Sequence, residues 1–148
     1  MLIKYSISVF ALMLFSQLSF SQENGLFEEH YDNGQLKVSG EYKNQERVGE
    51  WKEYFENGTL SHIYSYHKGK KNREGKSFFS SGELKYETKK IAESKFEFKE
   101  YFKNGNLFFE RVYPVGYLKE YYEAGELKIT STHNDGDLSG IWKFFFKT

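Results

Sequence analysis

Few side chains of this sequence combine the types and spacing that catalysis or metal binding requires. The chain has four histidines, and no two of them have metal-ligand spacing on a predicted helix: His30, His62, His67 and His133. Phosphate-binding loops, dinucleotide fingerprints, nucleophile elbows and zinc signatures are absent. The acidic residues are scattered at turns and form no pair that can be placed as glycosidase carboxylates. The sequence therefore predicts no catalytic residue, no metal site and no cofactor.

A short sequence unit recurs along the chain, and the structure of this unit must determine where its side chains lie. Each copy has an aromatic pair, or a histidine and a tyrosine, then two spacer residues, a glycine, one residue and a leucine. The clearest copy is G-E-W-K-E-Y-F-E-N-G-T-L at residues 49–60. Steps of 24, 24, 23 and 20 residues separate the glycines, which is typical of a repeat array. These glycines are Gly34, Gly58, Gly82, Gly105 and Gly125.

The Asn57-Gly58 dipeptide lies between two aromatic-rich runs and predicts a hairpin with a two-residue type I′ turn. That turn would pair Phe55 with Leu60 and Trp51 with Tyr64. Because side chains alternate along a strand, these four residues would share one face, which we expect to be the core. Over all units the expected core positions are Trp51, Phe55, Leu60, Tyr64, Phe102, Leu107, Tyr122, Leu127 and Trp142.

A second aromatic row would then project from the opposite face. It could serve to stack neighbouring repeats, or it could form a binding surface, since tyrosine offers both apolar area and a hydroxyl. In the same register Glu53 lies opposite His62, either as a cross-strand polar pair or as a general acid–base device. The candidate binding row is Tyr54, Phe78, Tyr101 and Tyr121.

The predicted fold class is all-β, a single-layer antiparallel meander of stacked β-hairpins preceded by a helical signal peptide. Residues 22–148 would form one domain, with units at about 27–49, 50–75, 76–95, 96–115, 116–140 and a terminal half-unit at 141–148. The sequence predicts polar return loops at residues 43–49 and 67–75, and a loop or helical turn at 88–95. The half-unit has no partner strand in its own hairpin, so it would be either a cap or a docking edge.

Residues 1–21 have the features of a secretory signal peptide. Lys4 supplies the charged start, residues 7–18 the apolar segment, and Ser19-Phe20-Ser21 the cleavage site, so the mature chain would begin at Gln22. We therefore expect export to the periplasm or the medium; the alternatives are an uncleaved anchor or a buried helix. The chain contains no cysteine, which excludes disulfides, thiol chemistry and a lipoprotein anchor.

The charge balance limits the class of partner. Without Lys4 the chain has 20 basic and 21 acidic residues, so it lacks the basic stripe of a nucleic-acid-binding protein. The same balance disfavours electrostatic binding to anionic membranes, although membrane binding stays open.

The unit G-x-W-x-x-Y-[FY]-x-x-G-x-L resembles MORN repeats, in the variant found in YwqK-like antitoxins. The resemblance covers about residues 27–148 and implies a curved sheet of hairpins that acts as a scaffold for protein or lipid contacts, with a toxin as the partner in the antitoxin case.

The leading hypothesis is an exported, non-enzymatic module that binds an unidentified protein. The alternative is a cell-envelope carbohydrate-binding module with Trp51, Tyr54, Tyr64 and Trp142 as sugar platforms. An enzyme would have to depend on the Glu53–His62 pair alone.

Overall fold

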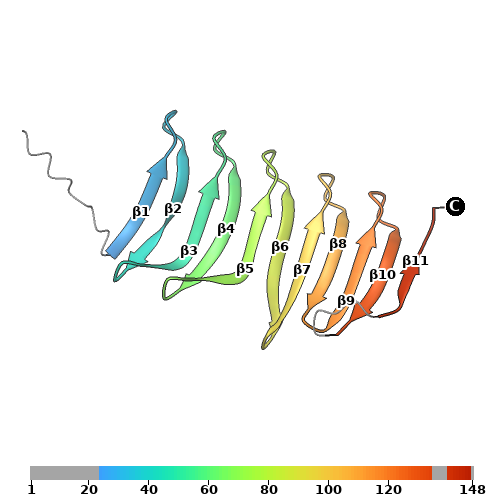
Figure 1. Ribbon diagram of the computed structural model, residues 1–148. Helices are drawn as coiled ribbons and strands as arrows, with labels where there is room; N and C mark the ends of the chain where they lie inside the picture. Colours follow the sequence, from blue (N-terminus) through green and yellow to red (C-terminus); the bar gives the residue numbers. More distant parts are fainter. Residues whose placement is uncertain (1–23, 135–139, 148) are drawn as a thin grey trace, which may run out of the picture.

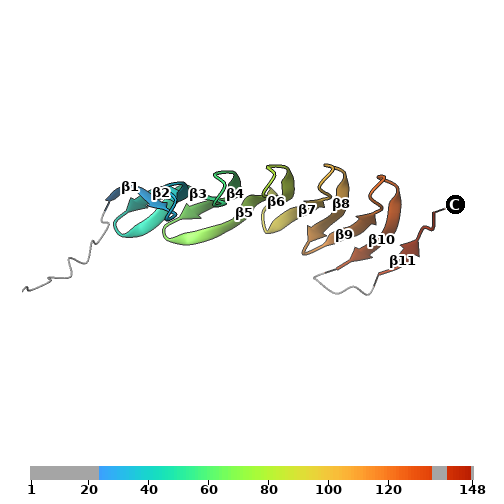
Figure 2. The same ribbon diagram turned by 90° about the horizontal axis from the view of Figure 1, so that it is seen from above.

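The computed structural model describes residues 24–134 and 140–147, and every regular element in them is a β-strand. Eleven strands form one antiparallel sheet in which each strand pairs with its neighbours in sequence. Figures 1 and 2 show an elongated row of hairpins in a single layer. The all-β, single-sheet prediction is confirmed. The strands are β1 Asn24–His30, β2 Leu36–Lys43, β3 Glu46–Tyr54, β4 Leu60–His67, β5 Lys70–Phe78, β6 Leu84–Ala92, β7 Lys95–Tyr101, β8 Leu107–Tyr113, β9 Gly116–Tyr121, β10 Leu127–His133 and β11 Trp142–Phe144.

The hairpin tips use a three-residue turn, so the predicted two-residue type I′ turn is wrong. In β3–β4 the amide of Gly58 donates to the Phe55 carbonyl at 2.8 Å, and the Phe55 amide donates to the Thr59 carbonyl at 2.8 Å. Only Gly58 has a positive φ, +83°, whereas Asn57 does not. This pattern is a type I turn followed by a glycine in the left-handed region, for which glycine has no steric cost.

The longer turn changes which residues face each other near the tip. Tyr54, and not Phe55, pairs with Leu60, and one extra residue in β4 then restores the register so that Trp51 pairs with Tyr64 as predicted. The predicted face of the leucines is therefore wrong, because they share a face with the first aromatic of each pair. The same shift recurs with Leu107 and Leu127, which pair with Tyr101 and Tyr121.

The return connections are tight turns, so the predicted return loops are wrong. Lys43 pairs with Glu46 across Asn44-Gln45, whose φ values are +52° and +64°. His67 pairs with Lys70 across Lys68-Gly69, again with two positive φ values. Residues 88–92, expected in a loop or helical turn, belong to β6. The paired positive φ values that define a type I′ turn thus occur at these two returns and not at the tips.

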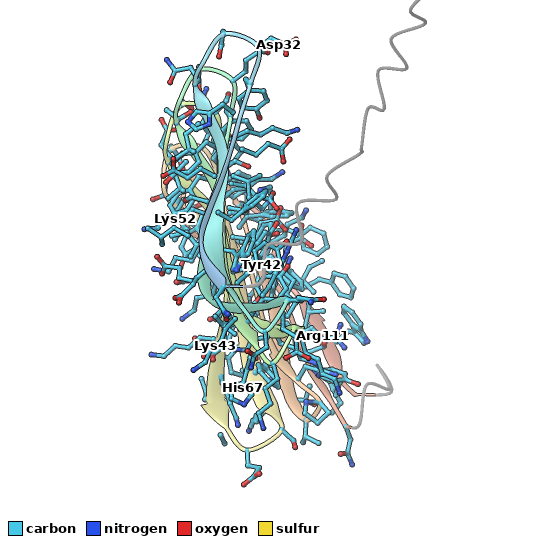
Figure 3. All side chains as sticks on the ribbon, turned by 90° about the vertical axis from the view of Figure 1, so that its left-hand side faces the viewer. Asp32, Tyr42, Lys43, Lys52, His67 and Arg111 are labelled. Atoms are coloured by element: carbon cyan, nitrogen blue, oxygen red, sulfur yellow. The ribbon has the colours of Figure 1, made fainter. Side chains whose placement is uncertain are left out.

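Two faces follow from the register across the sheet. We call one the tryptophan face; it carries the row of Trp51, Tyr64, Gly75, Thr88, Phe98, Arg111, Leu118, Ser131 and Trp142. We call the other the ladder face; it carries Lys52, Ile63, Lys76, Glu87, Lys99, Glu110, Lys119, Thr130 and Lys143. Figure 3 shows Lys52 and Arg111 on opposite sides of the ribbon.

Trp51 is the centre of the best-packed part of the sheet and is only 1% exposed. Its ring lies 5.1 Å from that of Tyr42, 5.6 Å from that of Phe27 and 5.9 Å from that of Tyr66. Gly40 gives the indole its space, because a Cβ there would lie 2.2 Å from the ring. Most other expected core residues are only half-buried, since a single layer covers neither face completely.

Trp142 was expected in the core, and that prediction is wrong. It is 38% exposed on β11, beside Phe144 at 60%. The cause is its place at the edge of the described sheet, where β10 covers one side only.

The tip asparagines connect one hairpin to the next. The Asn57 side-chain oxygen accepts from the Thr59 amide at 3.0 Å, and its NH₂ group donates to the Ser80 carbonyl of the next tip at 2.9 Å. Asn33 and Asn104 make equivalent bonds to the tips that follow them. The side chain of asparagine, and not its tolerance of positive φ, therefore explains its place before the glycine.

We expect Asn57→Ala to lower the free energy of unfolding by about 1 kcal/mol, since it removes three exposed hydrogen bonds, with the Ser80 carbonyl and with the amide and hydroxyl of Thr59. Urea denaturation checks this value. Ser81→Ala is the control, because Ser81 occupies the same tip position but bonds only to Glu83 of its own hairpin. Equal losses in the two variants would show that the link between tips contributes nothing.

Two predictions lie outside the described residues: the signal peptide at 1–21 and most of the return around residues 134–136. In the part of the chain that the structure describes, no helix has the length and apolarity to span a membrane.

Candidate functional site

The predicted binding row lies on the ladder face, opposite the Trp51 row, as the alternation of side chains predicts. All four of its members are half-buried. The Tyr101 hydroxyl donates to Glu87 at 2.9 Å and the Tyr121 hydroxyl donates to Glu110 at 2.6 Å. Burial, and then these carboxylates, raise the pKa of both tyrosines to about 12. Two hydroxyls of the row are therefore already used within the sheet.

Glu110 is the centre of a polar network on the ladder face and is 7% exposed. It accepts hydrogen bonds from Lys119 at 2.9 Å, Tyr121 at 2.6 Å and Tyr117 at 3.4 Å. Burial alone would raise its pKa, but the bonds from Tyr121 and Lys119 and the charges of Lys119 and Lys99 outweigh burial, so the pKa lies below its ordinary value. The buried carboxylate is thus satisfied and holds β8 to β9.

We expect Glu110→Gln to lower the free energy of unfolding at pH 7 by about 1.5–3 kcal/mol, the range for hydrogen bonds to a charged group. Because the folded-state pKa is depressed, the carboxylate stabilises the fold above the unfolded pKa of about 4.3 and loses that effect as pH falls through the folded value. Urea denaturation from pH 7 to 3 should show that the difference in free energy of unfolding between the wild type and Glu110→Gln becomes smaller below about pH 4.5. Glu41→Gln, at an exposed position, is the control. If the wild type is more stable than Glu110→Gln by the same free energy at every pH, this account is contradicted.

Glu53 and His62 face each other as predicted. The His62 Nδ1 and Glu53 Oε2 atoms are 3.5 Å apart, with side chains 30% and 41% exposed. The imidazole also contacts the Ser61 hydroxyl at 2.5 Å and stacks on Tyr64 with ring centroids 5.4 Å apart. The geometry is that of a cross-strand pair on an open surface.

Metal-binding clusters were searched for in residues 24–134 and 140–147. No group of three or more His, Cys, Asp or Glu side chains that could hold a metal ion occurs there.

Cations lie over aromatic rings on the tryptophan face. The Arg47 guanidinium is 4.2 Å from the Trp51 ring centroid, and the Lys71 ammonium is 3.0 Å from that of Tyr64. Arg73 and Arg111 lie 5.4 Å from the rings of Phe96 and Tyr113. Burial lowers the pKa of Lys71, and the charge of Glu53 opposes this effect. Such contacts stabilise both groups. The Arg47 guanidinium also donates to the hydroxyls of Tyr42 at 3.5 Å and Tyr66 at 3.3 Å.

The two faces differ in how their charges are compensated. On the ladder face, Lys52 is paired with Glu50 at 3.0 Å, Lys99 with Glu97 at 2.9 Å and Lys119 with Glu110 at 2.9 Å. Within the described residues, no ion pair joins Arg47, Lys71, Arg73 or Arg111 to a carboxylate. Lys128, which lies over the Tyr122 ring, is the exception among the ring-bound cations of this face, because it is paired with Glu120 at 2.6 Å. The tryptophan face therefore carries uncompensated positive charge beside apolar rings.

A hollow of about 340 Å³ is open on this face between β5 and β8. Its lining combines two arginines with four aromatic residues and a threonine: Arg73, Thr88, Phe96, Phe98, Phe109, Arg111 and Tyr113. The strand register brings its lining together, because Thr88 pairs with Phe98 and Phe98 pairs with Arg111 on successive strands.

Sequence reasoning missed Arg47, Lys71, Arg73 and Arg111 on the tryptophan face. Arg47, Lys71 and Arg73 lie in segments expected to be return loops, where a charge run is normally solvated. Once those segments are strands, the side-chain alternation that placed the tyrosines also places these cations, so a correct turn assignment could have found them. The structure also buries Trp51 under its neighbours, so Trp51 cannot serve as a sugar platform.

A family model described as MORN repeat variant matches residues 23–44, 47–68 and 114–135. The first two matches cover the hairpins β1–β2 and β3–β4, and the third covers β9–β10. The lining of the hollow, between residues 73 and 113, falls between the matched segments. A comparison with curated proteins finds no significant match.

Proposed function

We propose, from the MORN repeat variant matches and the charge pattern of the sheet, that this chain is an exported, non-enzymatic repeat scaffold that binds a partner protein on its tryptophan face. The observation that carries the proposal is the set of uncompensated cations over aromatic rings on that face. Aromatic and arginine side chains are the groups that contribute most to protein–protein contacts. The positive charge favours a partner with an acidic, partly apolar surface.

Two variants, each altered on one face, test the proposal. The tryptophan-face variant is Lys71→Ser/Arg73→Ser; the ladder-face variant is Tyr54→Ser/Tyr101→Ser/Tyr121→Ser. Proteins captured by the wild type from periplasmic extract or culture medium are identified, and the binding of the purified partner to each variant is measured. We expect the tryptophan-face variant to bind about tenfold more weakly, a loss that corresponds to one or two charge-assisted contacts.

Lys52→Ser/Lys76→Ser is the matched control, because it removes two lysines from the ladder face. Raised salt should weaken wild-type binding, since exposed charges are screened. If the tryptophan-face variant binds the partner as the wild type does and a folded ladder-face variant loses binding, the partner binds the row of Tyr54, Phe78, Tyr101 and Tyr121.

A narrower form of the same proposal takes the partner to be a toxin. It is supported by the resemblance of the repeat unit to the variant in YwqK-like antitoxins. Co-expression with toxins encoded beside this chain tests it: rescue of growth supports the narrower form, and unchanged toxicity with the chain correctly exported removes it.

A second candidate function is binding of envelope carbohydrate, favoured by the exposure of Trp142 and Phe144 at the end of the sheet. Their rings are stacked 6.5 Å apart and offer a flat apolar surface. Co-sedimentation with peptidoglycan, compared between wild type and Trp142→Ala, tests this candidate, and absence of co-sedimentation removes it.

A further inference from the structure

We propose that the hollow between β5 and β8 on the tryptophan face binds a carboxylate joined to an aromatic or branched apolar body. This inference goes beyond the proposed function, because it assigns a ligand chemistry to one small site whether or not the sheet binds a protein. It depends on three features of the hollow: two unpaired arginines, an aromatic lining, and a volume that suits a small group.

The arginines supply the recognition of charge. Arg73 and Arg111 both line the hollow, and neither is in an ion pair with any described residue. The Nε atom of Arg111 is buried and has no hydrogen-bond partner, so it is a donor whose desolvation nothing offsets. A guanidinium presents a planar fork of donors that fits a carboxylate in a bidentate manner.

No acid in the lining competes for these donors. Glu53, Glu100 and Glu120 are on the tryptophan face, in the row nearer the tips, and none of them lines the hollow. Glu120, which stands opposite the lining residue Phe109, is paired with Lys128 at 2.6 Å. An adjoining hollow of about 440 Å³ shares Arg73, Phe96 and Tyr113 and adds Lys90 and Glu93, whose charges offset each other. The net charge of the joined site is therefore positive.

The aromatic rings supply the apolar part of the site. Phe98 lies 6.1 Å from Phe109 and 5.7 Å from Tyr86, and Phe96 and Tyr113 pair on the same face. A hollow of about 340 Å³ is at the lower end of the range for small-ligand sites, which begins near ~300 Å³. It can therefore take one ring or branched side chain with its attached acid.

A carboxylate suits this lining better than a phosphate. A phosphate monoester carries a charge of about −1.5 to −2 at neutral pH, and removing that charge from water costs more than removing a single one. The lining offers only two guanidinium groups, and the rest of it is largely aromatic.

Amide NMR spectra of the full chain, titrated with N-acetylphenylalanine at pH 7, test the site. We expect saturable shifts confined to β5, β6, β7 and β8, with a dissociation constant in the millimolar range. N-acetylphenylalaninamide has the same ring but no charge, and it should bind at least tenfold more weakly. Equal binding of acid and amide, absence of shifts, or tighter binding of phenyl phosphate would each overturn the proposal.

Single substitutions connect the binding to the two arginines. Arg73→Gln, at an exposed position, should weaken binding of the acid about tenfold and leave binding of the amide unchanged. Arg111→Lys keeps the charge but loses the fork, and it should weaken binding to an intermediate degree. Lys76→Gln is the matched control, because it removes a cation from the ladder face of the same strand. If Arg73→Gln and a folded Arg111→Lys both bind like the wild type, the site is not the one described.

A titration with a peptide distinguishes a polypeptide C-terminus from a small carboxylic acid as the ligand. N-acetyl-Ala-Ala-Phe carries the same terminal group on a short polypeptide. If it binds as tightly as N-acetylphenylalanine, the hollow takes the C-terminus of a polypeptide; if it is excluded, the hollow takes small carboxylic acids. Either result supports recognition of a carboxylate on an apolar body.

Discussion

Replacing Trp51 by alanine is expected to lower the free energy of unfolding by about 3–5 kcal/mol, the usual cost of removing a buried aromatic side chain. The indole is 1% exposed and contacts the rings of Phe27, Tyr42 and Tyr66. A cavity at this place would also remove the surface beneath Arg47. Urea denaturation followed by circular dichroism measures the loss.

The chain contains its own control for this substitution. Trp142 occupies the equivalent position of the repeat but is 38% exposed. We therefore expect Trp142→Ala to cost several-fold less stability than Trp51→Ala. Equal losses in the two variants would mean that burial at Trp51 is not what stabilises the N-terminal part of the sheet.

Replacing Gly40 by alanine is expected to cost about 1–3 kcal/mol, the range for overpacking a filled site. A Cβ at this position would lie 2.2 Å from the Trp51 ring, so the indole or the backbone of β2 must shift. Thermal and urea unfolding check the value, with Ser39→Ala as the control on the same strand.

The cause of the Gly40 effect can be isolated with a double-mutant cycle. If the clash with the indole is responsible, Gly40→Ala should cost little in a Trp51→Ala background, since the added methyl then enters the space left by the ring. Additive losses would instead assign the effect to the β2 backbone.

The sheet could be predicted from the sequence because glycine and aromatic spacing repeats and side chains alternate. The pairs Trp51–Tyr64 and Glu53–His62 were correct even though the turn type was wrong. The three-residue turn displaces the register by one residue, and the extra residue in the following strand displaces it back. The three-residue turn and the extra residue thus offset each other beyond the tip. The leucines at the tip lie on the ladder face, opposite to the face that was predicted for them.

The candidate site was harder to predict, because it depends on turns that have weak sequence signals. Asn44-Gln45 adopts two positive φ values without a glycine, and Lys68-Gly69 lies within a basic run. Treating those segments as loops removed Arg47, Lys71 and Arg73 from the sheet. The partial exposure of the rings was also not visible in the pattern, since alternation gives the face of a side chain but not what covers it.

The register explains why the polar network of Glu110 and the ring-bound cations Arg73 and Arg111 occupy different faces. Carboxylates of the ladder face are used by its own lysines and tyrosines, as for Glu110 with Lys119 and Tyr121. Arg73 and Arg111 of the tryptophan face lie over rings and have no carboxylate partner among the described residues. The inferred carboxylate site is one place where this charge meets a hollow.

The central claim is that one open sheet carries these cations and rings on a single face. Cross-strand nuclear Overhauser effects in the labelled full chain test it most directly. The account predicts backbone contacts that link Trp51 to Tyr64, Thr88 to Phe98, Phe98 to Arg111 and Ser131 to Trp142, with none joining β1 to β11. Contacts between the first and last strands, or a pattern that places Arg111 directly opposite Lys99 in β7 and not opposite Phe98, would contradict it.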